Sequence, residues 1–340
     1  MKKQMNWSAL GFTFLALAIV YGVGTTFFTI ELERLVERTL TPRILASRGV
    51  DTLSKEIYAG VEPFMNTRYV RLIGYTCVGL ILLTSFVGLF TRSRSLANLG
   101  SFSLILPVYA YFVLHMSFLA GLGVLTALWA PFWGDLVRFG DIAYLPYMIL
   151  VYPFSLLGID IRQALAGLIV SLGLLILILG VMAWFYARSK KKITADFWIY
   201  RFTRHPQYLG WILWSYGLML RVAFRHDTVM GMDNPGASLP WALSTLIIVC
   251  VALSEDIQMR QLDPVVYTAY AQKAPFLFPL PVIVSRLVRG PFQWIIKKVR
   301  PESRFDLVWV FLIYLVLLSL LSLPFVLLDW PPGGWANWPF

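Results

Sequence analysis

Charged side chains are scarce in this chain of 340 residues. Asp, Glu, Lys and Arg make up 14% of the sequence, whereas soluble globular domains carry about 25%. Hydrophobic residues make up 58%, and the mean hydropathy is +0.70. A composition so poor in charge excludes an ordinary soluble domain and indicates a polytopic membrane protein.

Cysteine and histidine are also rare, with two and three residues respectively. Cys77 and Cys250 both lie in apolar runs, which favours small buried or lipid-facing residues over a disulfide or a metal-binding pair. The sequence contains no His-Glu-x-x-His, P-loop or Cys-x-x-Cys motif, so we expect no metal site. It also lacks the internal repeat that many transporters show.

Basic residues outnumber acidic ones, and the formal net charge is +11. The sequence places no basic patch in a soluble domain, so we expect no nucleic-acid partner. The basic residues instead concentrate in three segments between apolar runs, at residues 31–69, 188–204 and 257–306. Such segments are typical of cytoplasmic loops that lie near anionic lipid headgroups.

Eight apolar runs have the length, or nearly the length, of a membrane span. Such spans must be helices or closed barrels, and runs of about 20 apolar residues are too long for barrel strands. The runs cover residues 9–30, 70–90, 100–130, 142–158, 163–187, 208–224, 239–254 and 307–328. The sequence therefore predicts an all-α, polytopic helical membrane protein with about eight transmembrane helices.

The basic segments also predict the topology. With eight spans all three fall on one side, which the positive-inside rule identifies as cytoplasmic, and the uncharged tail from Trp330 to Phe340 falls outside. The run 100–130 is either one tilted helix or a bent pair, which leaves the side of the N-terminus open. We expect a multi-pass protein of the cell's inner or plasma membrane.

A different membrane contact is predicted after the seventh run. The stretch from Ser285 to Arg300 mixes large apolar residues with five basic ones. This pattern favours an interfacial amphipathic helix, interrupted at Gly290-Pro291. The alternative is a solvated basic loop.

The most informative stretch runs from Arg204 through His205, Pro206 and Tyr208, at the start of the apolar run 208–224. Ionisable groups at a membrane boundary are costly and point to function. Pro206 disfavours the α region for His205 and suits a first helical turn, so we expect a helix to begin here. Its free N–H groups attract anions, and Tyr208 offers a ring face to a purine or a sulfonium cation. The alternative is a headgroup anchor.

A pair of adjacent acids, Glu255-Asp256, ends the run 239–254. The pair is either an acidic helix end in water or a set of acceptors for ribose hydroxyls or an amino group. Tyr267, Tyr270 and Pro275 follow it.

Together these residues resemble the isoprenylcysteine carboxyl methyltransferases, which share their broader group with phospholipid N-methyltransferases. That family carries Gly-x-Tyr, Arg-His-Pro-x-Tyr-x-Gly, a helical hairpin, Glu-Glu and Tyr-x-x-Tyr-x-x-x-x-Pro. The matching segments here are Trp198 to Tyr200, Arg204 to Gly210, Glu255-Asp256, and Tyr267 to Pro275. The resemblance covers about residues 163–281.

The resemblance implies a cytosol-facing pocket in the C-terminal half that binds S-adenosylmethionine, and a lipophilic small-molecule or lipid acceptor that enters from the bilayer. It implies an S-adenosylmethionine-dependent methyltransferase acting on a lipid amine, thiol or carboxylate. Glu255 and His205 are the candidate catalytic bases, between which the sequence does not choose. The implied cofactor-binding residues are Tyr200, Arg204, His205, Pro206, Gln207, Tyr208, Gly210, Glu255 and Asp256.

The same interpretation predicts that the chain has three parts. Residues 1–158 hold N-terminal spans to which the sequence assigns no role, residues 159–284 form the methyltransferase-like core, and residues 285–340 hold the interfacial segment and the last span. The sequence does not specify an oligomeric state.

Three positions depart from the family pattern. Trp198 stands in the place of the glycine, and Asp256 in the place of the second Glu. Val251 stands where isoprenylcysteine enzymes carry an Arg that engages the substrate carboxylate. Without that guanidinium a carboxylate acceptor loses its bidentate partner, which favours an amine, a thiol or another lipophilic nucleophile.

Two other functions remain open from the sequence. Membrane sterol reductases, which use NADPH, have a related region whose motif resembles Asn-Tyr-x-Gly-Glu. Trp211 in the place of that Glu favours the methyltransferase branch. A non-catalytic transporter or membrane scaffold on the same core is the other alternative.

Overall fold

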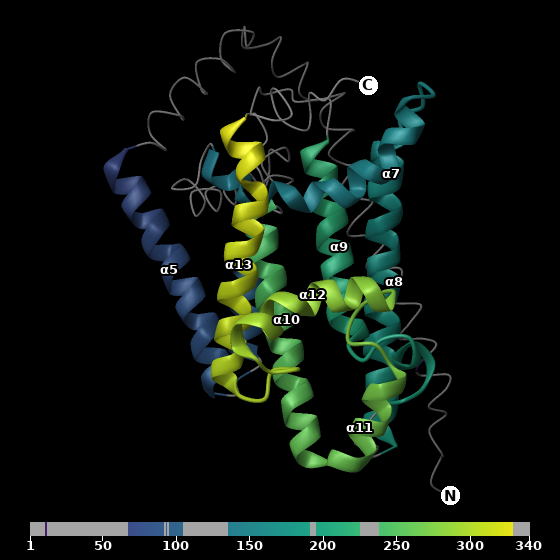
Figure 1. Ribbon diagram of the computed structural model, residues 1–340. Coiled ribbons are helices and arrows are strands. Elements are labelled where there is room, and N and C mark those ends of the chain that lie inside the picture. Colours follow the sequence, from purple (N-terminus) through teal and green to yellow (C-terminus); the bar gives the residue numbers. More distant parts are fainter. Residues whose placement is uncertain are drawn as a thin grey trace, which may run out of the picture. The chain divides into compact units, whose positions relative to one another are not determined.

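The computed structural model describes Gly11 and residues 67–91, 93, 95–104, 135–190, 195–224 and 238–328 (Figure 1). All regular elements in these ranges are helices, as the sequence predicts. They are α5 (Arg68–Thr91), a helical segment at 95–104, the 3₁₀ helix η3 (Asp135–Tyr144), α7 (Leu145–Ser155), α8 (Arg162–Ser189), the 3₁₀ helix η4 (Trp198–Arg201), α9 (Pro206–Ala223), α10 (Ser238–Leu262), α11 (Pro264–Lys273), α12 (Val282–Ile296) and α13 (Arg304–Leu327).

Four of the described helices are long and apolar enough to cross a membrane. They comprise Arg71–Thr91 within α5, together with α8, α10 and α13. Four of the predicted spans are thus confirmed as candidate spanning helices, and α10 continues past the predicted end at residue 254 to Leu262. The run 9–30 and most of the run 100–130 lie outside the described residues.

The predicted span over 142–158 is not confirmed. Residues 135–144 form the 3₁₀ helix η3, and α7 has only 11 residues, which correspond to about 16 Å against a hydrocarbon core of about 30 Å. Pro146 lies in the first turn of α7, a position that suits proline. Beyond its end, Gly158 turns the chain with a φ of 72°, a left-handed conformation that glycine adopts readily.

The predicted span over 208–224 is α9, which begins at Pro206 as expected from the His-Pro pair. With 18 residues and Arg221 in its last turn, α9 is not among the four candidate spans. Its start at Pro206 matters more than its length, because that start fixes the position of the residues just before it.

The candidate spans differ in how much of their surface other parts of the protein cover. In α10, 72% of the most apolar window is buried, against 28% to 33% in the other three. Aliphatic side chains such as Leu168, Leu175 and Leu320 remain exposed on α8 and α13, which is the surface that a bilayer would cover. Helix α10 is therefore an inner helix, and it carries the acid pair.

The chain divides into two compact units, each built from separated stretches. The described parts of the first are residues 168–190, 195–217 and 249–313; those of the second are 67–91, 93, 95–104, 135–167, 218–224, 238–248 and 314–328. The second contains paired serines, in which the hydroxyls of Ser101 and Ser244 lie 2.8 Å apart. All predicted site residues lie in the first unit.

Within the first unit, α8 and α9 approach closely through glycine. A Cβ placed on Gly210 would lie 2.3 Å from the backbone N of Leu177, and one on Gly173 would lie 2.3 Å from that of Trp214. Small residues allow two helix backbones to pack in this way where apolar burial alone does not drive association. Gly210 is therefore a packing residue in the structure.

The chain reverses after α10 through a capped turn. Asp263 accepts a hydrogen bond from the Val266 backbone N at 3.2 Å and precedes Pro264. An acidic N-cap and a proline in the first turn both favour the start of a helix, so α11 begins here. Helix α11 then runs back beside the end of α10 (Figure 1). This reversal returns Tyr267 to the acid pair and Tyr270 to the carbonyl of Tyr200.

We expect Gly210→Ala to destabilise the protein by about 1–3 kcal/mol, because an overpacked helix contact must open. The matched control is Gly79→Ala in α5, whose added Cβ would meet nothing within 4 Å. It should be neutral or slightly stabilising, since alanine favours helices. Apparent melting temperatures in detergent test both, and equal values for the two variants would contradict the close contact.

Candidate functional site

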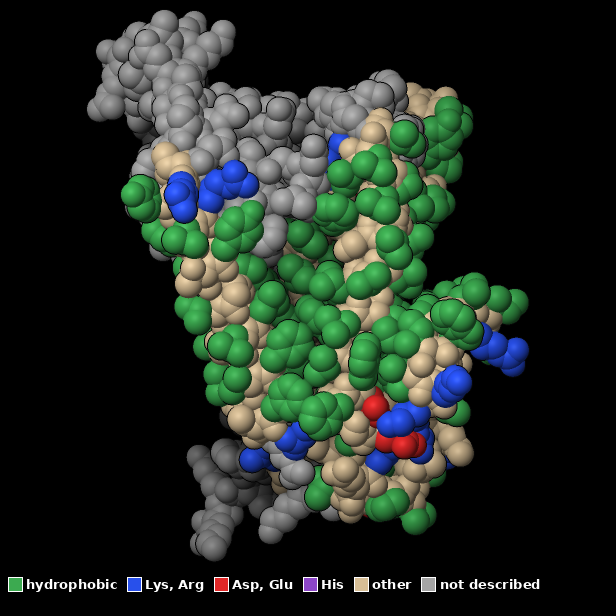
Figure 2. Space-filling model, turned by 60° about the vertical axis from the view of Figure 1, so that its left-hand side comes forward, with side chains coloured by type: hydrophobic (Ala, Val, Ile, Leu, Met, Phe, Trp, Pro, Cys, Tyr) green, Lys and Arg blue, Asp and Glu red, His purple; other side chains and the backbone are tan. Residues whose placement is uncertain are grey.

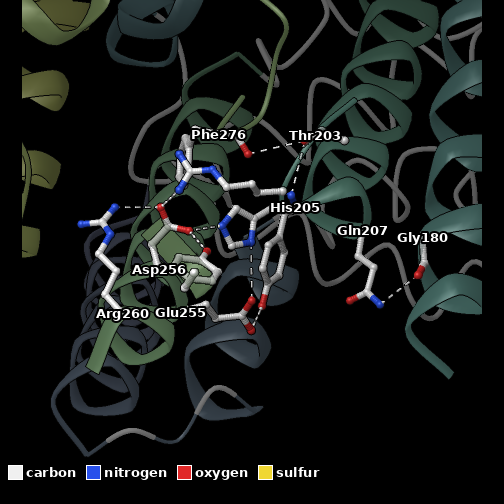
Figure 3. A network of polar contacts seen from close by, with 11 residues as sticks. Gly180, Thr203, His205, Gln207, Glu255, Asp256, Arg260 and Phe276 are labelled. Carbon is white, nitrogen blue, oxygen red and sulfur yellow. Dashed lines mark hydrogen bonds and ion pairs between the residues drawn. The ribbon is translucent and has the colours of Figure 1, made fainter. Parts of the chain in front are cut away.

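Two polar segments that are far apart in sequence meet at the end of α10. The imidazole of His205 lies between the two acids: Nε2 is 2.9 Å from Oδ1 of Asp256, and Nδ1 is 3.5 Å from Oε2 of Glu255 (Figure 3). The separation of His205 and Asp256 along the chain is 51 residues. Both ring nitrogens of His205 therefore face carboxylates.

Asp256 is the centre of this cluster. Its side chain is 2% exposed and contacts four donors. The guanidinium of Arg204 and the hydroxyl of Tyr267 both donate to it. Arg260 donates to Oδ2 at 3.1 Å, and His205 completes the set. A carboxylate with four partners is compensated for its burial, so Asp256 holds the surrounding side chains in place.

Glu255 has a different environment, although it is the next residue. Its side chain is 22% exposed, and Oε1 accepts a hydrogen bond from the hydroxyl of Tyr208 at 2.9 Å. Adjacent helical residues point about 100° apart, which explains why one acid is buried and the other opens partly to the outside. Glu255 is the acid of the pair that a ligand can reach.

The local sequence fixes the position of His205. Its backbone N donates to the hydroxyl oxygen of Thr203 at 3.3 Å, and its carbonyl accepts from the Leu209 backbone N at 2.9 Å. Pro206 begins α9, so the imidazole projects from the residue just before a helix start. The start of α9 therefore places a positive dipole end next to His205.

His205 is buried, and the acids around it determine its charge. Burial alone would lower the pKa of the imidazole, but hydrogen bonds to Asp256 and Glu255, together with their negative charges, raise it above the ordinary value. Acids on both sides stabilise the imidazolium form. The two acids therefore favour the protonated form of His205, whose ring links the two carboxylates.

The segment after α11 closes one side of the cluster. The Arg204 backbone N donates to the Pro275 carbonyl at 2.9 Å, and the Thr203 hydroxyl donates to the Phe276 carbonyl at 3.4 Å. The ring of Phe276 lies 5.2 Å from that of His205, edge-on, and 5.5 Å from the Arg204 guanidinium. These contacts hold residues 203–205 and residues 275–276 together.

Tyrosine side chains connect the remaining motif segments to this cluster. The hydroxyl of Tyr270 donates to the Tyr200 carbonyl at 2.8 Å. Burial raises the pKa of Tyr200, Tyr267 and Tyr270, so all three stay neutral near physiological pH. Neutral hydroxyls keep the proton that the hydrogen bonds of Tyr267 and Tyr270 require.

The predicted site residues separate into two groups. Six lie in or beside the polar cluster: Tyr200, Arg204, His205, Tyr208, Glu255 and Asp256. Three face α8 instead. The amide of Gln207 donates to the Gly180 carbonyl at 3.5 Å (Figure 3), a Cβ on Gly180 would lie 3.1 Å from Pro206, and Gly210 contacts Leu177.

Arg260, Thr203 and Phe276 also take part in the cluster and were not predicted. Arg260 lies four residues after Asp256 on the same helix, a spacing that pairs side chains and could have identified it. Thr203 acts through its hydroxyl, and Phe276 through its carbonyl and its ring; the sequence offers no signal for these contacts.

Trp198 adopts a φ of 51°, in the left-handed region that favours glycine. The chain thus keeps the backbone conformation that suits the glycine of the resembling motif. Its indole stacks on Tyr186 with ring centroids 5.7 Å apart and contacts Phe197 edge-on, and these contacts offset part of the backbone strain.

Comparison of the chain with protein-family models, curated proteins and solved structures returns no match. Among the described residues, no group of three His, Cys, Asp or Glu side chains is arranged to hold a metal ion. Cys77 and Cys250 are both free thiols, in agreement with the sequence.

The two neighbouring acids should differ sharply in their contribution to stability. We expect Asp256→Asn to destabilise the protein by about 3 kcal/mol or more, since it leaves buried cations without a counter-charge. Glu255→Gln should cost much less, because Glu255 is partly solvated. Thermal unfolding in detergent distinguishes the variants, and a similar loss in both would refute the different roles.

We also expect a stability component that depends on His205. Its pKa is raised in the folded state, so the contribution is fully present below the ordinary histidine pKa and is lost as the pH rises through the raised value. His205→Gln should remove this component. Melting temperatures of both proteins between pH 6 and pH 9 give the test, and parallel curves would exclude a stabilising imidazolium.

Proposed function

We propose that the protein is an S-adenosylmethionine-dependent methyltransferase that acts on a lipophilic or membrane-embedded acceptor. The observation that carries the proposal is the meeting of the motif segments in one cluster. Arg204-His205, Tyr208, Glu255-Asp256 and the two tyrosines of α11 all join it. Segments that resemble one family's cofactor motif and also converge in space support a shared site more strongly than sequence spacing does.

The residues present fit the chemical groups of this cofactor. Glu255 is partly exposed and can accept hydrogen bonds from an ammonium group or from ribose hydroxyls. The start of α9 offers N–H groups to a carboxylate, and the ring of Tyr208 offers its face to an adenine or a sulfonium. Asp256, whose partners surround it, supports this arrangement as a positioning residue.

When bound, the cofactor would supply a methyl group that is already activated, so the protein mainly orients, desolvates and removes a proton. Glu255 is the better candidate base. A carboxylate with 22% exposure can accept the proton of an attacking amine or thiol, whereas an imidazolium at His205 has no free lone pair. The imidazole of His205 instead lies beside the Glu255 carboxylate, with Nδ1 3.5 Å from Oε2.

The surroundings of the cluster favour an acceptor without a carboxylate. Val251 is 1% exposed, so an arginine at this position would be buried rather than presented to a substrate. Arg204 and Arg260 are both bound to Asp256, so both guanidinium groups already have a carboxylate partner within the protein. A lipid amine or a thiol is the acceptor class that fits these residues.

The protein would be multi-pass, with the site facing the cytoplasm. The basic segments on either side of the site residues, 188–204 and 257–306, support this orientation by the positive-inside rule. The cytoplasm also contains the S-adenosylmethionine that the reaction consumes.

The test is equilibrium binding of S-adenosylmethionine to the detergent-purified protein. We expect saturable binding that Glu255→Gln and Tyr208→Ala each weaken about tenfold or more, since each loses a charged hydrogen bond or a ring face. Glu302→Gln, which changes an exposed acid outside the cluster, is the matched control and should bind as the native protein does.

The alternative outcomes are also informative. Unchanged binding in both site variants would place the cofactor elsewhere. No binding to a folded protein, together with binding of NADPH, would identify a reductase. Binding of neither cofactor would leave a transporter or scaffold.

A further inference from the structure

Helix α12 is strongly amphipathic. It runs without a break from Val282 to Ile296, with Pro291 inside it. The predicted interruption at Gly290-Pro291 is therefore wrong. The added Cβ of an alanine at Gly290 would meet nothing within 4 Å, so the surface of the helix is open at this point.

Most of the apolar residues of α12 lie along one side and are exposed. At 100° per residue, Ile283, Leu287 and Trp294 fall within about 40° of one another on the helical wheel. They are 73%, 70% and 82% exposed. Val284, Val288 and Ile295 continue the same side at 40% to 50% exposure. Large apolar side chains gathered in this way form a contact surface rather than an ordinary water-exposed face.

The basic residues of α12 lie on the opposite side. Arg286, Arg289 and the C-cap residue Lys297 fall together on the wheel with Gln293, and α12 contains no acidic residue. Figure 2 shows the separation where α12 projects at the right, with hydrophobic side chains above and Lys and Arg below. Phe292, which is 4% exposed, faces a third direction and anchors the helix to the protein.

The link to α13 fixes where this surface lies. Lys298 contacts both carboxylate oxygens of Asp306 at 2.9 Å, and the backbone N–H groups of Glu302 and Ser303 donate to Oδ2. This tight turn holds α12 crosswise to the first turns of α13, a candidate span (Figure 1). A helix lying across the start of a membrane span lies where headgroups meet acyl chains.

The basic residues of α12 indicate what covers its exposed apolar side. A protein partner would have to supply both an apolar groove and acids on its rim, whereas a bilayer interface that contains anionic lipid presents both together. We propose that α12 is an in-plane membrane helix whose apolar side enters the acyl boundary, while Arg286, Arg289 and Lys297 bind anionic phospholipid headgroups. The proposal does not rest on the proposed function.

Spin labels on the full-length protein in lipid nanodiscs test this proposal. Cys77 and Cys250 are first changed to serine and alanine, and a nitroxide is attached to Leu287→Cys or, as a water-exposed reference on α11, to Gln272→Cys. For each label we compare its accessibility to oxygen with its accessibility to a nickel chelate. We expect this ratio to be several-fold higher for the Leu287 label than for the Gln272 label. The nanodiscs contain either phosphatidylcholine alone or phosphatidylcholine with phosphatidylglycerol.

The charge requirement has its own pair of variants. With phosphatidylglycerol present, Arg286→Glu should move the Leu287 label outward, as a measurable rise in its accessibility to nickel. Lys273→Glu, the same charge change on α11, should leave it unmoved. Native mass spectrometry gives an independent measurement. The Arg286→Glu protein should retain fewer phosphatidylglycerol molecules than the Lys273→Glu protein.

Three outcomes would overturn the proposal. A Leu287 label as accessible to nickel as the Gln272 label would place the helix in water. Low accessibility to both reagents would mean that protein covers the surface. A lipid-buried label that responds neither to phosphatidylglycerol nor to Arg286→Glu would remove the anionic headgroup from the inference.

Discussion

The compensated charge of Asp256 is the interaction on which the candidate site depends. A buried carboxylate near the C-terminal end of an apolar helix is costly unless cations and hydrogen-bond donors surround it. Here the donors come from the residues before α9, from α10 itself and from α11. The same contacts that neutralise one charge therefore hold three separate chain segments together, and the backbone bonds to Pro275 and Phe276 reinforce them.

This arrangement gives the two acids complementary roles. Asp256 is enclosed and sets the geometry, whereas Glu255 is partly open and keeps its carboxylate toward the outside. His205 couples them through opposite ring nitrogens. A site built in this way can expose one acid while the fold depends mainly on the contacts of the other.

Much of this could be predicted from the sequence. Hydropathy located α8, α10 and α13, and the His-Pro pair located the start of α9, because these features follow from local chain chemistry. Hydropathy could not show that residues 142–158 break into a 3₁₀ helix and a short α7. Nor could it show that Gly210 faces α8, since a glycine's packing partner is a tertiary property. The two acids were found as a pair, but their unequal burial depends on the helix face that each occupies.

The order of the partners along the chain bears on synthesis in the cell. The ribosome makes Arg204 and His205 well before Asp256, 52 and 51 residues earlier. Arg260 and Tyr267 follow it after 4 and 11 residues. Asp256 is thus made after two of its partners and shortly before the other two, so a cationic partner is already present when α10 is completed.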